Sequence, residues 1–369
     1  MAAREEKLRI IKRDLESRIN ELNALSEISR LITSSDNLNK MLGFIAKKIT
    51  AMVKADICMV HLLNKGAFTP KMVYGAMRDR DTALKLAHVL SKSKLASRVL
   101  RTERIQIVDN LIRHKKDPFC GFCARESMQS LLMAPLVERG TVLGTLTCCS
   151  KRPYAYTKDD EEEILLFANQ AAMAVENARL FDNIKVNYLN TMKLVAGIID
   201  SKDRYTESHS EQVMRTALGI ASILNLSVKQ KTIIRYASLL HDIGKVGIDT
   251  TILRKTGPLT REEWVEMMRH PKVGAEIIKK AGFLDELIPS ILYHHVRYSG
   301  GGYPPTRKRR EAIPIEARIM AVADAYEAMR SKRPYRKRLS RESAVSELKR
   351  NSGTQFDPKV VNALLKVLR

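Results

Sequence analysis

The chain has 369 residues and a formal net charge of +23 at neutral pH. It is too long for one ordinary hydrophobic core, so we expect two domains, and its 44% hydrophobic and 28% charged residues exclude a disordered or membrane-embedded chain. We find neither a signal sequence nor a run of about 18 apolar residues, which predicts a cytoplasmic protein without a membrane span. The basic surplus favours an anionic partner such as a nucleotide, a nucleic acid or a membrane surface.

The N-terminal segment, residues 1–34, has apolar residues three or four apart from Leu8 to Ile32. This spacing predicts one long helix over residues 4–34. Its apolar stripe is either a coiled-coil seam between two subunits or a face that packs on the next domain. We favour the seam and therefore expect a homodimer.

The next segment, residues 35–180, mixes helical and strand patterns. Helical spacing over 38–53 precedes strand-like stretches at 57–63, 105–108, 130–137 and 142–149, and a helical pattern returns after residue 158. The last two strands are separated by residues 138–141, which include Gly140 and predict a hairpin turn.

This arrangement resembles the GAF family of small-molecule sensor domains. The resemblance rests on SLLMAPLVERGTVLGTLTC at 130–148 and on the closing helix at 159–181. It implies a six-stranded antiparallel sheet flanked by helices, with a pocket for a small ligand on one face. Ligands in the family are diverse, so the resemblance does not identify the ligand.

All five cysteines lie in the first half of the chain, and their odd number argues against a disulfide framework. Cys120 and Cys123 have a spacing that can bind a metal or form a redox pair. A structural zinc site needs further thiolates, for which Cys148 and Cys149 are the local candidates. We favour free thiols in a loop over these two alternatives.

The helical pattern at the end of the first domain continues through residues 181–200 without a stretch rich in glycine or proline. A continuous helix transmits rotation or axial shift better than a flexible linker. We therefore expect a signalling helix that connects a sensor to an output domain.

The sequence HDIGKVG at 241–247 places His241 beside Asp242 after an apolar stretch with helical spacing. Both side chains should project from a core helix into the interior. A buried charge without a partner costs several kcal/mol, so Asp242 needs a cation, and a metal is the obvious supplier. Its two oxygens can bridge two ions about 3.5–4 Å apart.

Five histidines and one further aspartate follow residue 200 in distinctive local contexts, mostly 24 to 32 residues apart. This spacing places the groups on different helices of a bundle, where they can converge on one interior point. The candidates, besides Asp242, are His209, His241, His270, His294, His295 and Asp324.

These strings, in this order, resemble the HD-GYP branch of the HD phosphohydrolase superfamily. HDIGK supplies the HD pair and Gly302-Tyr303-Pro304 the GYP, within residues 201–369. The resemblance implies an all-α, metal-dependent phosphodiesterase that cleaves cyclic di-GMP or, in some members, cyclic GMP-AMP. The expected architecture is an α+β GAF domain joined by a long helix to an all-α HD-GYP domain.

The resemblance also assigns the ligands. One metal would take His209, His241, Asp242 and Asp324, and the second would share Asp242 and take His270, His294 and His295. Nitrogen and carboxylate ligands suit iron or manganese, although zinc or nickel fits such a site too. Some relatives hold a third metal with a carboxylate where this chain has Tyr205, so we expect two divalent ions per chain.

The same resemblance assigns the reaction chemistry. Asp242 and Lys245 are the catalytic candidates, and Lys245 should contact the scissile phosphate and stabilise transition-state charge. Arg333 and Arg336 match substrate-phosphate positions, for which guanidinium forks are suited. Gly302 allows a close backbone turn around a ligand, and Tyr303 offers a face for guanine.

Two departures from the family keep alternatives open. Val296 stands where a glutamate commonly follows the histidine pair, and residues 307–310 are RKRR in a loop that is usually acidic or neutral. The basic run is either a solvated loop or an attraction for an anionic dinucleotide or a partner protein. A non-catalytic signalling module is the main alternative function, and a di-iron oxygenase is disfavoured by the GYP segment. Nucleic acid is not expected as a partner.

Overall fold

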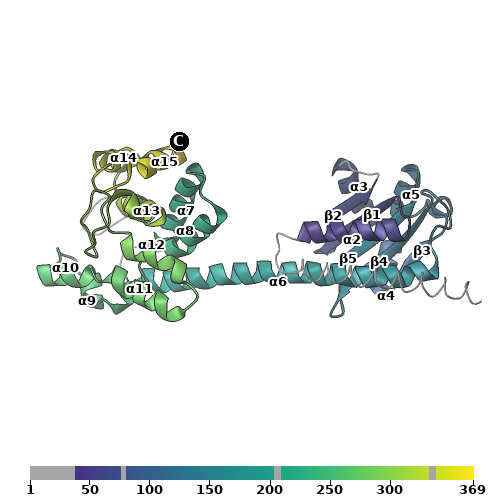
Figure 1. Ribbon diagram of the computed structural model, residues 1–369, viewed down its shortest axis with the longest axis horizontal. Helices are drawn as coiled ribbons and strands as arrows, with labels where there is room; N and C mark the ends of the chain where they lie inside the picture. The colour runs from purple at the N-terminus through teal and green to yellow at the C-terminus, as the bar shows by residue number, and fades with distance from the viewer. Residues whose placement is uncertain (1–37, 76–79, 203–208, 332–337) are drawn as a thin grey trace, which may run out of the picture. The chain divides into compact units, whose positions relative to one another are not determined.

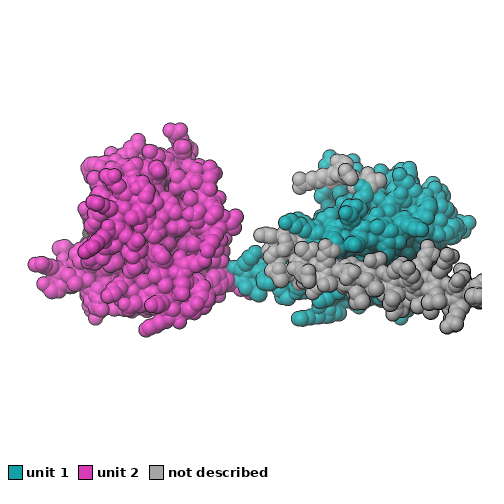
Figure 2. Space-filling model, viewed as in Figure 1, with its two compact units in different colours: residues 1–185 teal, residues 186–369 magenta. Residues whose placement is uncertain are grey.

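The computed structural model describes residues 38–75, 80–202, 209–331 and 338–369. The chain divides into two compact units, residues 1–185 and 186–369, whose secondary structure is drawn in Figure 1 and whose extents are coloured in Figure 2. The predicted helix over 4–34 lies outside the described residues. The domain limits expected at residues 34, 180 and 200 stay predictions.

Unit 1 is built on one antiparallel sheet with the spatial strand order β2-β1-β5-β4-β3 (Figure 1). The strands are β1 Ile57–Asn64, β2 Ala67–Gly75, β3 Gln106–Val108, β4 Ser130–Glu138 and β5 Thr141–Ser150. Four of them match the predicted strands. Within the described part of unit 1 the sheet has five strands, one fewer than the GAF resemblance implies.

The sequence pattern does not predict strand β2, because Pro70 and Lys71 interrupt its apolar residues. Proline cannot donate a ladder hydrogen bond and is therefore tolerated mainly at sheet edges. Strand β2 is an edge strand, and its pairing register with β1 shifts between Val60 and His61, next to the position of Pro70.

The predicted hairpin between β4 and β5 is confirmed. Its loop consists of Arg139 and Gly140, whose φ angles are 51° and 73°. Positive φ at both central positions is typical of the two-residue turn whose twist matches that of antiparallel strands.

Alternate residues of the central strands face two separate apolar cores. On β1, Cys58 and Val60 join one core, whereas Ile57 and Met59 join the other. The first core is covered by α2 Leu38–Met52 and the start of α6 Lys158–Lys202. The second core is covered by α3 Arg80–Leu90, α4 Lys94–Thr102, η2 Leu111–His114 and α5 Pro118–Arg125.

Helix α6 runs without interruption for 45 residues, as the sequence predicts. It begins with three acidic residues, which is favourable at a helix N-terminus. Its buried residues join the unit 1 core as far as Ala178 and the unit 2 core from Met192. The side chains of residues 179–187, between these two contacts, are exposed.

Unit 2 is helical, and its described residues form no strand beyond two isolated bridges. Its helices are α7 His209–Ile223, α8 Val228–Leu240, α9 Thr250–Leu253, α10 Arg261–Met267, α11 His270–Ala281, α12 Ile288–Tyr293, α13 Ile315–Arg330, α14 Arg341–Arg350 and α15 Pro358–Val367. Three 3-10 turns connect them: η3 Ile243–Gly247, η4 Asp285–Leu287 and η5 Arg310–Ala312. These elements confirm the expected fold class of an α+β unit followed by an all-α unit.

The core of unit 2 lies between two groups of helices. Apolar residues of α7, α13 and α15 form one cluster, and residues of α6, α8, α11 and α12 form another. No helix in the described ranges is long and apolar enough to cross a membrane.

Candidate metal centre and adjoining pocket

The ligand candidates lie at helix ends rather than within helices, with one exception. His209 and His270 are the first residues of α7 and α11, whereas His241 and His294 directly follow α8 and α12. Only Asp324 lies inside a helix, α13. The expectation that the HD pair projects from a helix is therefore corrected: α8 ends at Leu240, and Asp242 precedes the 3-10 turn η3.

Gly244 allows this turn to pack directly on the start of α11. A Cβ atom at this position would lie 1.9 Å from the carbonyl oxygen of His270 and 2.6 Å from the amide nitrogen of Gly274. Only glycine leaves room for this approach. The close packing brings Asp242 next to His270.

Three of the imidazoles are anchored in the same way. The Nδ1 atoms of His241, His270 and His294 lie 2.8, 2.8 and 2.6 Å from the backbone carbonyl oxygens of Ser238, Met267 and Ile291. A carbonyl oxygen only accepts, so Nδ1 carries the proton and, in the neutral ring, Nε2 carries the lone pair. Metal-binding histidines are commonly oriented by such a hydrogen bond.

Asp242 lies between two of these Nε2 atoms. One carboxylate oxygen is 3.3 Å from Nε2 of His241, and the other is 3.3 Å from Nε2 of His270. Nζ of Lys245 is 2.9 Å from the oxygen that faces His241. Burial alone would raise the pKa of Asp242, but the charges of Lys245 and His241 outweigh it and hold the pKa well below its usual value.

Burial lowers the pKa of His270, His294 and His295, that of His295 to about 3. These rings are therefore neutral near pH 7. The Nε2 lone pair of His270 then faces an anionic oxygen of Asp242 at 3.3 Å. Two lone pairs repel each other unless a cation lies between them, so this geometry fits a cation held by both groups.

The side chains form two groups, and within each group the candidate ligand atoms lie within 4.8 Å of one another. The first group is His209, His241 and Asp324, and the second is His270, His294 and His295. Asp242 faces one member of each group. In addition, the buried Nε2 of His294 has no hydrogen-bond partner among the described residues. A buried acceptor without a partner and two nitrogen-rich groups around a shared carboxylate fit two divalent cations.

His209 differs from the other imidazoles because its Nε2 lies 3.1 Å from a carboxylate oxygen of Asp324. Burial lowers the pKa of His209, but the hydrogen bond and the charge of Asp324 outweigh this effect and raise it. The residue after His209, Ser210, donates hydrogen bonds from its backbone N–H and its hydroxyl to Asp200, a buried residue of α6. The sequence analysis missed Asp200, although an acidic residue in an otherwise apolar helix stripe is a signal.

A pocket of about 530 Å³ opens beside the second group. Its lining includes His294, His295, Tyr303 and Asp324, together with Trp264 on α10, which the sequence analysis missed. The rings of Trp264 and Tyr303 lie edge to face with centroids 6.4 Å apart. Trp264 is 49% exposed, which is unusual for the only tryptophan of the chain unless it contacts a ligand.

Gly302 and Tyr303 occupy the expected place at this pocket. Gly302 has a φ of 82°, and a Cβ atom there would lie 2.3 Å from the carbonyl oxygen of His295. The ring of Tyr303 lies 4.6 Å from that of His295. Burial raises the pKa of Tyr303, so its hydroxyl remains a proton donor.

Three further predictions concern two arginines, Val296 and the basic loop 307–310. Arg333 and Arg336 lie outside the described residues. The side chain of Val296 is buried with Ile313 and Ala317, so this position supplies no polar group to the centre. In the basic loop, Lys308 lies over the ring of Tyr293, and the other three cations are exposed.

The cysteine motif in unit 1 does not form a metal site. Cys120 and Cys123 lie on helix α5, which corrects the expectation of a loop, and they are buried in the second apolar core. All five cysteines of the chain are free thiols. Burial raises the pKa of the Cys120 thiol, and a hydrogen bond with Cys149 raises that of Cys123. Buried thiols of high pKa are poor nucleophiles and metal ligands.

Comparisons with known proteins agree with this division of the chain. A GAF domain family model matches residues 35–176, and an HD domain family model matches residues 193–360. The cyclic di-GMP phosphodiesterase response regulator RpfG of Xanthomonas campestris pv. campestris is 36% identical over 201 residues, which are 53% of this chain and 53% of that protein. The 3'3'-cGAMP-specific phosphodiesterase 2 of Vibrio cholerae is 30% identical over 209 residues, 56% of this chain and 40% of that protein.

The chain thus spans about half of the length of these relatives or less. Among solved structures, the GAF domain of an Acinetobacter phosphoenolpyruvate-protein phosphotransferase covers 43% of this chain and 94% of its own, with 20% identity and a TM-score of 0.35. Together with the metal-binding geometry, the two family models show that the chain carries a GAF domain followed by an HD domain whose relatives are cyclic dinucleotide phosphodiesterases of the HD-GYP type.

Proposed function

We propose that unit 2 hydrolyses a phosphodiester bond of a cyclic dinucleotide, with cyclic di-GMP as the preferred substrate and cyclic GMP-AMP as the alternative. The observation that carries the proposal is the position of Asp242, whose two oxygens face one imidazole from each of the two ligand groups. This is the arrangement that a carboxylate shared by two cations needs.

The metal ligands proposed are the seven predicted side chains, with Asp242 common to both ions. When bound, two divalent cations, proposed to be iron or manganese, would supply Lewis acidity toward phosphate oxygens and lower the pKa of water. The anchored Nδ1–H groups leave the Nε2 lone pairs of His241, His270 and His294 available to hold such ions. Their rigid orientation reduces the reorganisation needed during the reaction.

Lys245 is the proposed transition-state donor. Its ammonium lies 2.9 Å from a carboxylate oxygen of Asp242, and its side chain is 16% exposed, so a phosphate bound at the centre comes within its reach. A cationic donor in a largely dehydrated site stabilises the charge that develops on phosphate oxygens.

Substrate binding is assigned to the pocket beside the centre. Tyr303 and Trp264 offer aromatic surface on which a purine base can stack, and Gly302 lets the backbone approach a ligand closely. Arg333 and Arg336 remain the proposed phosphate contacts. Both relatives quoted above act on cyclic dinucleotides by name, which supports this substrate class without choosing between its members.

The expected product is linear pGpG. A two-metal centre opens the ring by one in-line cut, whereas a second cut, to GMP, must bind a more flexible and more highly charged substrate. Chromatography of the reaction over time distinguishes the two outcomes. Accumulation of GMP without a pGpG intermediate would refute the single-cut product.

The proposal also includes regulation of unit 2 by the GAF domain and formation of a homodimer. The uninterrupted helix α6 supports coupling, because it contributes to the cores of both units. Its exposed apolar residues Leu180, Ile184, Leu194 and Ile198 share a seven-residue repeat that is typical of a coiled-coil seam. Light scattering on the full chain should give the mass of a dimer, and a monomer mass at micromolar concentration would contradict it.

The experiment that tests the activity uses the full chain, purified without oxygen and supplied with Fe²⁺ or Mn²⁺. Cyclic di-GMP and cyclic GMP-AMP are offered separately, with and without a chelator. We expect chelator-sensitive hydrolysis of at least one of them, faster for cyclic di-GMP. A metal-loaded chain that binds but hydrolyses neither would reject the enzyme and support the non-catalytic module, for which the buried Val296 is the relevant observation.

A further inference from the structure

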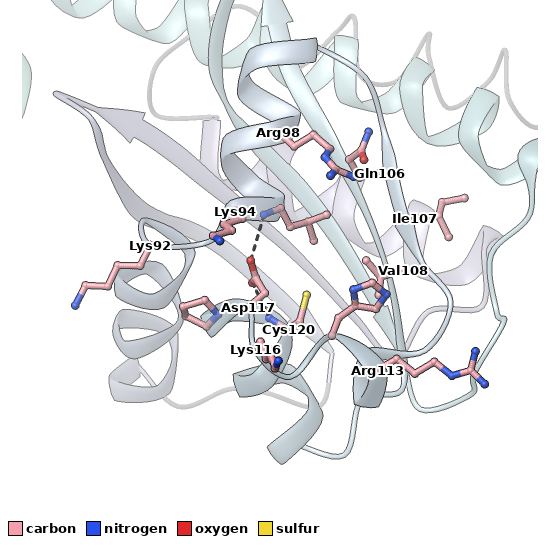
Figure 3. A pocket seen from close by; sticks show the side chains of 13 residues that line it. Lys92, Lys94, Arg98, Gln106, Ile107, Val108, Arg113, Lys116, Asp117 and Cys120 are labelled. Atoms are coloured by element: carbon pink, nitrogen blue, oxygen red, sulfur yellow. Dashed lines mark hydrogen bonds between the residues drawn. The ribbon is translucent and has the colours of Figure 1, made fainter.

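Unit 1 contains a pocket of about 630 Å³ that none of the observations above explains. It lies where α4, β3, η2 and α5 meet, and its volume is that of a site for a small molecule. Its floor includes the buried side chains of Val108 and Cys120. Figure 3 shows the side chains that line it.

The pocket is lined by five lysine and arginine side chains and a single carboxylate. The cations are Lys92, Lys94, Arg98, Arg113 and Lys116, and the carboxylate is that of Asp117. In Figure 3, Arg98 and Gln106 lie at the α4 end, Lys94 and Asp117 near the middle and Lys116 at the α5 end, whereas Lys92 and Arg113 extend outward.

Asp117 forms no ion pair with these cations among the described residues, and its single negative charge leaves a surplus of four positive charges around the pocket. It accepts hydrogen bonds from the hydroxyl of Ser93 at 2.9 Å and from the backbone N–H groups of Leu95 at 3.2 Å, Phe119 at 3.0 Å and Cys120 at 3.2 Å. The carboxylate thereby caps the N-termini of both α4 and α5. Most backbone amides at these helix ends already donate hydrogen bonds, so side chains would supply most contacts to a ligand.

Within the described residues, none of the five cations forms an ion pair, although the chain forms ion pairs elsewhere. Like charges gathered around one concavity repel each other and raise the local concentration of anions. A flat cationic surface attracts polymers, whereas a concave one of this volume with an apolar floor suits a small molecule.

We propose that this pocket binds a small organic polyanion, a molecule with two or more phosphate or carboxylate groups, held by Lys94, Arg98 and Lys116. The apolar floor contacts the body of the ligand, and the amide of Gln106 supplies a neutral hydrogen bond. The ligand of the GAF domain in this chain is therefore multiply anionic. The proposal is independent of the catalytic activity of unit 2.

The experiment is calorimetric titration of the full chain at low ionic strength with inorganic pyrophosphate and, separately, with citrate. The first probe represents phosphate-bearing ligands and the second represents carboxylates, so the stronger binder identifies the anionic group. The pocket variant is Lys94→Gln/Arg98→Gln/Lys116→Gln. The control variant, Arg101→Gln/Arg104→Gln/Lys115→Gln, removes the same charge from exposed neighbours that do not line the pocket.

We expect the pocket variant to bind the preferred probe at least about tenfold more weakly than the wild type, because charged hydrogen bonds are lost. The control variant should bind like the wild type. Probe binding at the metal centre of unit 2 is unaffected by either variant and is subtracted in this comparison. Single variants Arg98→Gln and Arg101→Gln repeat the test if a triple variant unfolds.

Three results would overturn the proposal. The first is equal affinity of all three proteins, which would place binding at the metal centre. The second is equal weakening in the pocket and control variants, which would indicate non-specific attraction. The third is the absence of binding of either probe to the wild type.

Discussion

In the candidate metal centre of unit 2, the polar side chains are buried and point at one another, whereas in the basic pocket of unit 1 they are exposed and surround an open volume. In the centre, His270, His294 and His295 are neutral and Asp242 is ionised, so their lone pairs and its negative charge favour cations. In the pocket, five lysines and arginines surround a single carboxylate, so the positive surplus favours an anion. In each site, the burial of the side chains and the charges around one aspartate, Asp242 or Asp117, thus determine whether the site attracts a cation or an anion.

Asp242→Ala should have the largest effect, because it removes the one carboxylate shared by both ligand groups. We expect hydrolysis of cyclic di-GMP to fall by more than about 10³-fold, beyond the loss of a single transition-state donor. The matched control is Asp285→Ala, which removes an exposed carboxylate of η4. Full activity in the Asp242 variant would show that the centre does not depend on a shared carboxylate.

Lys245→Ala separates charge stabilisation from metal binding. We expect metal content to remain and turnover to fall by roughly 10²–10³-fold, the effect of losing one donor. The control Lys279→Ala removes an exposed ammonium from α11. Loss of metal in the Lys245 variant would show instead that its contact with Asp242, 2.9 Å long, has a structural role.

Trp264→Ala tests whether the pocket beside the centre stacks a base. Loss of one base–aromatic contact of about 1–3 kcal/mol should raise KM roughly 5- to 150-fold and leave kcat within a few-fold. Trp264→Phe should restore part of the affinity because it keeps a ring. An unchanged KM in the alanine variant would remove Trp264 from the binding site.

Gly244→Ala tests the packing that assembles the centre. The added Cβ would overlap the carbonyl oxygen of His270, so we expect chemical denaturation to show a loss of about 2 kcal/mol or more in the free energy of unfolding. Gly247→Ala is the control, because its Cβ would meet only a side-chain methyl of Val273 at 3.3 Å. Equal stability of both variants would contradict the tight fit of η3 on α11.

The smallest expected effect is that of pH on the stability of the metal-free chain. An exposed imidazole takes up a proton as the pH falls through about 6.5, but burial lowers the pKa of His295 to about 3. The unfolded chain therefore binds more protons, and the stability contributed by neutral His295 falls by about 2 kcal/mol between pH 6.5 and 5. His209, whose pKa is raised, acts in the opposite direction.

Thermal denaturation of the metal-free chain between pH 6.5 and 5 measures the net result of these two opposing effects on stability. A metal-free chain that becomes more stable toward pH 5 would show that the raised pKa of His209 dominates.

The fold class could be predicted because local signals encode it: periodic apolar residues and a hairpin turn. The seven ligand candidates, which rest on histidines in distinctive strings, stay a prediction that the observed side-chain clusters support. Strand β2 could not be predicted, because its edge position alone explains why it tolerates Pro70. The roles of Asp200 and Trp264 could not be recognised from the sequence, because the residues that pack beside them are distant along the chain. The same is true of Asp117, whose four donors come from two separate helix ends.

The most direct test of the shared role of Asp242 is the metal content of three proteins purified without oxygen: wild type, His209→Ala and Asp242→Ala. His209 belongs to one ligand group only, whereas Asp242 faces both. Elemental analysis should therefore give two metal ions per chain in the wild type, one in the His209 variant and fewer than one in the Asp242 variant. Three ions in the wild type, or equal losses in the two variants, would contradict a two-metal centre built around Asp242.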